Sequence, residues 1–309
     1  MRKLITAVLL LSAVRMSAQE SAGESAALPF LNQIRSVKTA GTAGIYGMAG
    51  SDFNMHFGNV AGASFMEDAA MAGVSYSLWQ PDAADADIFS AGGAYRVSDR
   101  ITVTAGISSS LYRKEGKYDE FGLRTAEILP VDMLAGAGVA YRFMDCLSAG
   151  AAFNYVMSKN ISGTLNAFSA DVQLAFRKKG WKASVAACNL GPKVKGSDGA
   201  GWQLPMNARL NAGYEFDFRK SAFCLSAQGQ YYFGGPSAVS GGVALEYVWN
   251  RLLSVRMGYD NGSRKNGVPT CAAAGAGIRL GGFSIDLAYS AMASGPMKNT
   301  LACGVGYSF

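Results

Sequence analysis

The chain has 309 residues, of which 50% are hydrophobic and only 16% are charged, and its formal net charge is +6. It contains 38 glycines, 16 phenylalanines and 14 tyrosines. No uninterrupted apolar span reaches the length of about twenty residues that a transmembrane helix needs, so insertion as helices is not expected. No block of Lys and Arg is interleaved with stacking aromatics, and we expect no nucleic-acid partner.

The first 18 residues have the pattern of a secretory signal peptide. Arg2 and Lys3 precede an apolar run from Leu4 to Val14, and a stretch of small residues ends at Ala18. We therefore expect residues 1–18 to be removed on export. Their removal subtracts three basic residues and no acidic ones, which lowers the net charge from +6 to +3 (6 − 3).

Residues 19–70 show no clean alternation of polar and apolar residues. Glu20–Ala27 is polar and could be a disordered periplasmic leader, whereas Leu28–Phe65 is apolar and rich in glycine. A barrel of many strands with small residues on its inner face leaves space to fill. We expect this segment to lie in the lumen as a plug.

From Met71 onward the chain resolves into alternating segments of about ten residues, the length of a tilted strand that crosses a membrane. In Gly73–Trp79, for example, Val74 and Leu78 fall on one face and Ser75 on the other. The alternation predicts fourteen strands: Gly73–Trp79, Phe89–Val97, Ile101–Ser108, Met133–Phe143, Leu147–Met157, Phe168–Arg177, Trp181–Asn189, Met206–Phe218, Phe223–Phe233, Val239–Trp249, Leu253–Asp260, Ala272–Leu280, Phe283–Ser290 and Leu301–Phe309.

The lengths of the connections give an independent test. Short links, such as Ser98–Arg100 and Lys178–Gly180, follow every even-numbered strand, and mostly longer ones, such as Arg113–Val131, follow the odd-numbered strands. Bacterial outer-membrane barrels have short periplasmic turns and long outer loops. Soluble β-sandwiches also contain many alternating strands, but seldom with this strict alternation of links. The sequence predicts an all-β transmembrane antiparallel barrel over residues 71–309, with both ends periplasmic, in the cell outer membrane.

The expected outer face carries aromatic residues near the strand ends, for example Tyr95 and Trp249 at the periplasmic side and Tyr155 toward the other side. Two such belts match the headgroup levels of a bilayer, so outer-membrane lipid is an expected partner. The last strand, which ends at Phe309, resembles the C-terminal signal that the barrel-assembly machinery reads. That machinery is a second expected partner.

The expected lumen face is rich in Gly, Ala and Ser, yet it also carries charged residues. Ionisable groups that face lipid are costly, so this placement supports the assignment of inner and outer faces. Such groups either pair across the polar interior, which is the simpler expectation, or hold the plug and line a route. The candidates for lumen and plug contacts are Arg96, Arg142, Arg177, Arg209, Glu215, Glu246 and Arg279.

No motif indicates catalysis. His56 is the only histidine, it lies outside the strands, and no serine nucleophile is evidently placed beside it. The five cysteines are widely spaced and odd in number, which argues against a full disulfide framework and against a metal site. We expect no catalytic residue, no metal and no cofactor.

Short motifs connect the chain with a known family. The stretch from Phe30 to Ala61, with Gly47-Met48-Ala49, Asp52 and Asn59-Val60-Ala61, is similar to the N-terminal signature of the PorV and PorQ proteins, which are related to the FadL fatty-acid transporters. Lys38 stands where that signature has arginine, and Val60 where it has proline.

Three further stretches resemble PorV in particular: Val74–Trp79, Asn189–Lys193 and Leu204–Leu210. With the strand pattern, the resemblance covers most of the chain from Phe30 to Phe309. The positions that match the family motifs include Asn59, Trp79, Asn189, Pro205 and Asn207.

The resemblance implies a barrel that binds type IX secretion cargo by its C-terminal sorting domain and shuttles it to the attachment complex, with cargo and type IX components as partners. The main alternative is FadL-like transport of hydrophobic small molecules, because a plugged fourteen-stranded barrel is also the architecture of those channels. A shuttle predicts a lumen open to a peptide, whereas a transporter predicts an apolar tunnel. A general porin is the third possibility, and the bulky N-terminal segment disfavours it.

Overall fold

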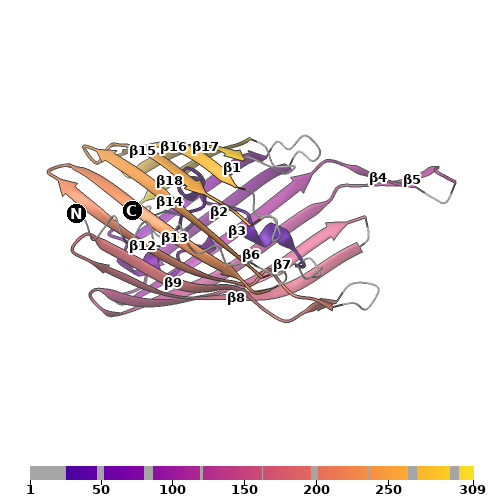
Figure 1. Ribbon diagram of the computed structural model, residues 1–309, viewed down its shortest axis with the longest axis horizontal. Helices are drawn as coiled ribbons and strands as arrows, with labels where there is room; N and C mark the ends of the chain where they lie inside the picture. Colours follow the sequence, from indigo (N-terminus) through magenta and orange to yellow (C-terminus); the bar gives the residue numbers. More distant parts are fainter. Residues whose placement is uncertain are drawn as a thin grey trace.

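The computed structural model describes residues 26–46, 52–79, 86–118, 121–161, 163–195, 201–234, 237–263, 270–292 and 299–309. Within these ranges, fourteen antiparallel strands form one closed barrel, which confirms the predicted fold and strand number. Figure 1 shows the barrel from the side, with the C-terminus at the end that carries the short turns. The signal peptide expected at residues 1–18 lies outside the described residues.

Each barrel strand pairs with its neighbours in chain order, and the last strand closes the barrel on the first through nine paired positions from Met71↔Ser308 to Trp79↔Thr300. The strands are β1 (Ala70–Trp79), β2 (Ala86–Arg96), β3 (Ile101–Tyr112), β6 (Val131–Met144), β7 (Leu147–Asn160), β8 (Gly163–Lys178), β9 (Trp181–Leu190), β12 (Asn207–Phe218), β13 (Ser221–Tyr232), β14 (Ala238–Trp249), β15 (Leu253–Asp260), β16 (Cys271–Leu280), β17 (Phe283–Met292) and β18 (Thr300–Ser308).

Two connections that the sequence pattern left as loops contain short paired strands. β4 (Glu115–Tyr118) pairs with β5 (Arg124–Ile128), and β10 (Val194–Lys195) pairs with β11 (Gly201–Trp202). Figure 1 shows β4 and β5 projecting beyond the barrel at the end opposite the C-terminus. These strands do not cross lipid, so they lack the apolar alternation that marks the barrel strands.

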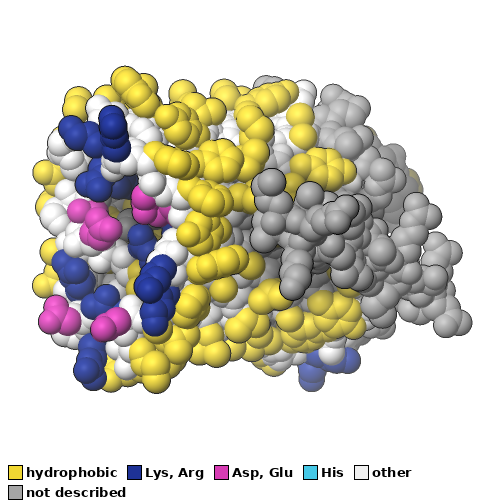
Figure 2. All heavy atoms as spheres, turned by 60° about the vertical axis from the view of Figure 1, so that its left-hand side comes forward, with side chains coloured by type: hydrophobic (Ala, Val, Ile, Leu, Met, Phe, Trp, Pro, Cys, Tyr) yellow, Lys and Arg dark blue, Asp and Glu magenta, His cyan; other side chains and the backbone are white. Residues whose placement is uncertain are grey.

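The exposure of side chains alternates along the strands as predicted. Val74 is 60% exposed on the outside of β1, whereas Ser75 and Ser77 are each 7% exposed on the inside. Apolar side chains therefore face outward and polar ones inward, the reverse of a soluble protein. Figure 2 shows hydrophobic side chains across the flank of the barrel, next to a periplasmic end where Lys, Arg, Asp and Glu gather. Such a surface fits a bilayer.

Several periplasmic turns have two residues with positive φ, as in type I′ hairpins, whose twist matches that of the flanking strands. Lys179 and Gly180 have φ of 50° and 81°, and Gly281 and Gly282 have φ of 56° and 86°. Glycine meets the left-handed backbone at no steric cost. The turns thus keep the strands in the register that the alternation requires.

The described N-terminal residues lie inside the barrel and form the plug. The plug contains η1 (Pro29–Asn32), α2 (Val37–Ala40), η2 (Met55–Phe57) and η3 (Ala61–Phe65). α2 begins after Ser36, whose Oγ accepts a hydrogen bond from Thr39 N at 3.2 Å. α2 packs against β16, β17 and β18, and η3 packs against β3, β6, β7 and β8. Among the described residues, no helix has the length and apolarity to cross a membrane.

Candidate functional site

A cavity of about 520 Å³ lies in the lumen between the plug and the barrel wall. One part of it is apolar. Phe30 and Leu31 of the plug pack there with Leu134 of β6 and with Leu204, which lies between β11 and β12. Pockets for small molecules are mostly apolar and contain a few placed polar groups. This part of the cavity can take an apolar body.

The rest of the cavity is lined by polar and charged side chains. Arg35, Tyr46 and His56 come from the plug, and Asp171 and Arg209 come from β8 and β12. All five are brought together by the way the plug sits in the barrel, since the plug and wall residues are far apart in sequence. The cavity therefore joins an apolar part to a part that can bind a polar group.

Arg35 organises the start of the plug. Its Nη1 donates to the carbonyl oxygens of Leu31 and Gln33 at 3.3 and 3.1 Å, and its Nη2 donates to that of Phe30 at 2.9 Å. The side chain is buried, and its Nε has no partner among the described residues. Burial lowers the pKa of Arg35, although an arginine begins so high that it stays charged.

Arg209 reaches from β12 to two parts of the plug. Its Nη2 donates to the carbonyl oxygen of Gly58 at 2.9 Å, and its guanidinium carbon lies 4.0 Å from the ring centre of Tyr46. A Cβ at Gly58 would lie 2.3 Å from the Tyr46 ring, so glycine is needed there. Burial raises the pKa of Tyr46, which keeps the phenol neutral. The result is a buried cation–π contact between wall and plug.

His56 anchors the plug to the opposite wall. Its Nε2 lies 2.8 Å from Asn154 Oδ1 on β7, and its Nδ1 lies 3.3 Å from Thr104 Oγ1 on β3. The Asn154 amide in turn donates to Asp171 Oδ2 at 3.3 Å. Burial lowers the pKa of His56, so the imidazole is neutral at pH 7, with Nε2 donating to the Asn154 oxygen. These contacts are those of an anchor between plug and wall.

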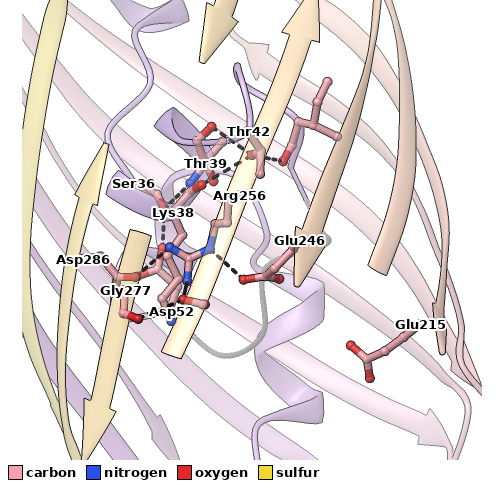
Figure 3. A network of polar contacts seen from close by, with 12 residues as sticks. Ser36, Lys38, Thr39, Thr42, Asp52, Glu215, Glu246, Arg256, Gly277 and Asp286 are labelled. Carbon is pink, nitrogen blue, oxygen red and sulfur yellow. Dashed lines mark hydrogen bonds and ion pairs between the residues drawn. The ribbon is translucent and has the colours of Figure 1, made fainter. Parts of the chain in front are cut away.

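Below the cavity, Arg256 of β15 lies between two carboxylates (Figure 3). Its Nε donates to Glu246 Oε1 at 2.6 Å and its Nη1 to Asp286 Oδ1 at 2.8 Å. Gly277 leaves the space for this group, because a Cβ there would lie 2.3 Å from Asp286 Oδ1. The plug residues Ser36 and Asp52 lie close by and are hydrogen-bonded to each other (Figure 3).

Glu215, which stands apart from that group in Figure 3, binds Lys182 of β9 with an Nζ to Oε2 distance of 2.6 Å. The charged candidates Glu215 and Glu246 thus each form an ion pair with a residue on the neighbouring strand, on the lumen side of the barrel. The sequence pattern did not single out their partners, Lys182 and Arg256.

Two of the predicted arginines bind the end of the plug at the periplasmic rim. Arg96 donates to the carbonyl oxygens of Met66 and Glu67 at 3.5 and 3.0 Å. Arg177 Nη1 donates to the carbonyl oxygen of Phe65 at 3.4 Å. They lie at the rim, away from the cavity.

The other two rim arginines do not contact the plug through any described bond. Arg142 Nη2 donates to the carbonyl oxygen of Asp99 in the turn after β2 at 2.5 Å. Arg279 is exposed near the end of β16. Of the seven charged candidates, only Arg209 lines the cavity.

Three positions of the family motifs form one cluster at the cavity, which Asn189 and Asn207 line. The side-chain amides of Asn189 and Asn207 both donate to the carbonyl oxygen of Pro205 at 3.2 Å. Asn189 has φ of 58°, a left-handed conformation that asparagine tolerates, and its N–H donates to Asp171 at 2.7 Å. The cluster fixes the connection between β9 and β12.

The remaining motif positions lie elsewhere. Asn59 Oδ1 accepts from Gln173 Nε2 at 3.5 Å, within the plug's contact with β8. Trp79 ends β1, where its backbone pairs with Ala86 and Thr300. At the other end of the barrel, Phe309 N donates to the carbonyl oxygen of Ala70 at 2.9 Å.

Sequence reasoning missed Arg35, Tyr46, Gln173 and Gln228, all of which line the cavity. Arg35 had one available signal, since it and Lys38 are the two Lys or Arg residues in the apolar stretch Leu28–Phe65. The glutamines are polar residues in alternating strands and had none. Within the described ranges, no group of three His, Cys, Asp or Glu could hold a metal ion, and all five cysteines are free thiols.

Solved structures with the same architecture are outer-membrane proteins. The toluene transporter TbuX of Ralstonia pickettii has a TM-score of 0.65 at 12% identity, over 90% of this chain and 99% of TbuX. The monoaromatic hydrocarbon channel CymD has a TM-score of 0.62 at 11% identity, over 89% and 97%. A FadL homologue of Pseudomonas aeruginosa has a TM-score of 0.55 at 12% identity, over 89% and 98%.

No protein-family profile matches the sequence. No curated protein matches it either. The similarity to the solved structures is therefore one of fold, and it does not single out PorV. The chain is a fourteen-stranded barrel of the FadL-type fold and belongs in the cell outer membrane.

Proposed function

We propose that this protein is a channel that carries hydrophobic small molecules across the outer membrane. The observation that carries the proposal is the cavity of about 520 Å³ between plug and wall, with its apolar part around Leu31 and Leu134. Its size is in the range of small-molecule pockets, which is roughly 300–1,000 Å³. Cargo with a folded sorting domain would need a far larger space.

The lining supports a ligand with an apolar body and one polar group. Arg35, Tyr46 and Arg209 lie at the polar part of the cavity and offer hydrogen-bond donors. The Nε atoms of both arginines are buried and have no partner among the described residues. A donor that is buried without a partner costs free energy, and a ligand oxygen could relieve that cost.

The fold supports the same proposal. Of the structures named above, TbuX is described as a toluene transporter, CymD as a monoaromatic hydrocarbon channel, and the third as a FadL homologue. At 11–12% identity these likenesses give the architecture, so the ligand class comes from the cavity in this chain. Passage through a barrel needs no chemistry on the ligand, which favours a channel over an enzyme.

An uptake assay tests the proposal. The chain is expressed in a Gram-negative host that lacks its own channels for such molecules, and uptake of radiolabelled toluene, oleate and a small sugar is measured. We expect faster uptake of toluene, of oleate or of both, and no gain for the sugar. Uptake that equals the empty-vector control for both hydrophobic probes would overturn the proposal, and a gain for the sugar would indicate a general porin.

A pair of variants connects uptake with the cavity. Leu134→Trp places a large side chain in the cavity, and we expect uptake to fall by at least tenfold. Leu210→Trp makes the same change on the lipid-facing side of β12, where Leu210 is exposed, and should leave uptake unchanged. Equal uptake by the two variants would contradict a route through the cavity.

Carriage of type IX secretion cargo stays a prediction from the sequence motifs, as do binding of type IX components and recognition of the strand ending at Phe309 by the barrel-assembly machinery. Secretion of sorting-domain proteins after deletion of the gene is the test for the cargo role. Unchanged secretion would reject it.

A further inference from the structure

The plug is attached to the barrel wall in two different ways on two sides. Ten neighbouring strands, β14 to β18 followed by β1, β2, β3, β6 and β7, form what we call the docked arc. The four remaining barrel strands, β8, β9, β12 and β13, are also neighbours and form the arm side.

On the docked arc, the plug lies directly on glycines. A Cβ at Gly150 of β7 would lie 2.6 Å from Ala61 N, and one at Gly258 of β15 would lie 2.4 Å from Thr42 C. Real side chains do not approach so closely, so these positions require glycine. A Cβ would also come within 3.0 Å of plug atoms at Gly73, Gly92, Gly106, Gly136, Gly242 and Gly306.

The same close packing continues across β16 and β17. A Cβ at Gly275 would lie 3.0 Å from Cα of Gly41 in the plug, and one at Gly41 would lie 3.6 Å from Cβ of Ala288. Short side chains add hydrogen bonds here. Ser290 Oγ donates to the carbonyl oxygen of Ala40 at 3.2 Å, and Ser148 Oγ donates to that of Ala61 at 2.8 Å.

On the arm side, long side chains make the described hydrogen bonds between wall and plug. Gln173 of β8 accepts from Ala61 N at 3.0 Å, and Arg209 of β12 donates to the carbonyl oxygen of Gly58 at 2.9 Å. Gln228 of β13 accepts from Tyr46 N at 3.1 Å and donates to the carbonyl oxygen of Gly44 at 3.3 Å. We call these three side chains the arms.

The cavity borders both the docked arc and the arm side, and on the arm side it reaches the side chains that hold the plug. All three arms line it, together with Ala186 and Cys188 of β9. An arm can leave its plug partner by changing rotamer, a motion of picoseconds to nanoseconds in exposed residues that is slower when a side chain is packed. The docked arc lacks this freedom at Gly150, Gly258 and Gly275, where the backbone of the wall touches the backbone of the plug.

Building on the proposed channel function, we propose that the plug stays on the docked arc while the ligand passes it along β8, β9, β12 and β13. Gln173, Arg209 and Gln228 are the gate residues of this route. A ligand with a polar group, such as oleate with its carboxylate, can itself bind the arm or plug group whose hydrogen bond is lost, so the gate opens without release of the plug.

A disulfide between plug and docked arc tests whether the plug must move. Gly41→Cys with Ala288→Cys places the two Cβ atoms about 3.6 Å apart, within the range for a disulfide, in a chain whose five native cysteines are replaced by alanine. We expect oleate uptake to be equal, within twofold, in the oxidised and reduced forms. Loss of uptake on oxidation and its return on reduction would overturn the proposal.

A block on the arm side tests the route. Ala186→Trp fills the space between β9 and the plug and should lower oleate uptake at least tenfold. The neighbouring Val185 faces lipid, so Val185→Trp is the matched control and should transport like the parent. Both variants are first checked for heat-modifiable migration on gels, which reports a folded barrel. A folded Ala186→Trp variant with normal uptake would overturn the route.

A thiol probe separates this proposal from the proposed function. Cys224 lies on β13, four residues closer to the periplasm than Gln228, and can be kept as the one thiol of the chain. With Gln173→Ala and Gln228→Ala, we expect a small charged methanethiosulfonate added outside the cell to label Cys224 at least tenfold faster than in the parent. An unchanged rate would reject the gate. This result does not depend on whether any hydrophobic molecule is transported.

Discussion

The docked arc and the arm side hold the same plug by different physical means. On the docked arc, Gly150 and Gly258 let the plug backbone touch the wall backbone, whereas on the arm side Gln173 and Gln228 bridge a gap with their side chains. Glycine packing cannot relax in small steps, and side-chain bridges can. The difference teaches that one barrel can fix a plug firmly and still keep one side of the lumen adjustable.

The largest expected effect comes from the charge cluster on the docked arc. Arg256 is 4% exposed and pairs with Glu246 and Asp286. Arg256→Met leaves two buried carboxylates without a cation, and we expect a loss of about 3–5 kcal/mol in the free energy of unfolding. Urea unfolding of the barrel refolded into lipid vesicles measures it.

The arm side supplies the matched comparison. Lys182 pairs with Glu215, whose side chain is 24% exposed and can be rehydrated when the cation is lost. Lys182→Met should therefore cost roughly 1 kcal/mol. If Arg256→Met and Lys182→Met lowered the free energy of unfolding by the same amount, the carboxylates of the docked arc would be as easily rehydrated as Glu215 of the arm side.

An effect smaller than that of Arg256→Met is expected from one methyl group on the docked arc. Gly150→Ala puts a Cβ against Ala61 N, and overpacking of this kind costs about 1–3 kcal/mol. We also expect faster proteolysis of the plug, because Ala61 no longer packs closely on β7. Gly229→Ala is the control, since a Cβ at Gly229 of β13 meets no atom within 4 Å. The proposal of close docking fails if both variants unfold at the same urea concentration.

The barrel could be predicted from the sequence because lipid on one face and lumen on the other impose an alternation that local residues reveal. β8 shows the limit of this signal. It begins at Gly163 rather than at the predicted Phe168, because the strand continues above the membrane, where the outward positions carry polar Thr164 and Asn166 and the inward ones apolar Leu165 and Ala167, the reverse of the pattern in lipid.

The plug contacts could not be predicted in the same way. The plug has no period, and each of its anchors depends on a partner far along the chain, as in the bond between Ala61 N and Gln173, 112 residues apart. Charged lumen residues stood out in the alternating strands, so Arg209 was found. In the sequence, a glutamine arm or a glycine on which the plug packs cannot be told from any other polar or small lumen residue. Its role is visible only once the plug is folded in the barrel.

The smallest expected effect concerns pH and again separates the two sides. His56 is held on the docked arc by Thr104 and Asn154, with Asp171 and Arg35 as the charged groups that act on it, and burial lowers its pKa below 6.5. The unfolded chain therefore takes up a proton more readily than the folded one. The contribution of His56 to stability is complete above about pH 6.5 and is lost as the pH falls from there toward the folded pKa.

His56→Gln removes this titration and keeps a hydrogen-bonding side chain, so it is the reference for the measurement. Urea midpoints of the parent and the variant are compared at pH 8, 7, 6 and 5, where carboxylates contribute equally to both. We expect the difference between them to be constant from pH 8 to 7 and to move in favour of the variant below about pH 6.5. A difference that stays constant down to pH 5 would mean that His56 is not held neutral. The docked arc would then tolerate a charge at its centre, which its close packing and its hydrogen bonds to the imidazole argue against.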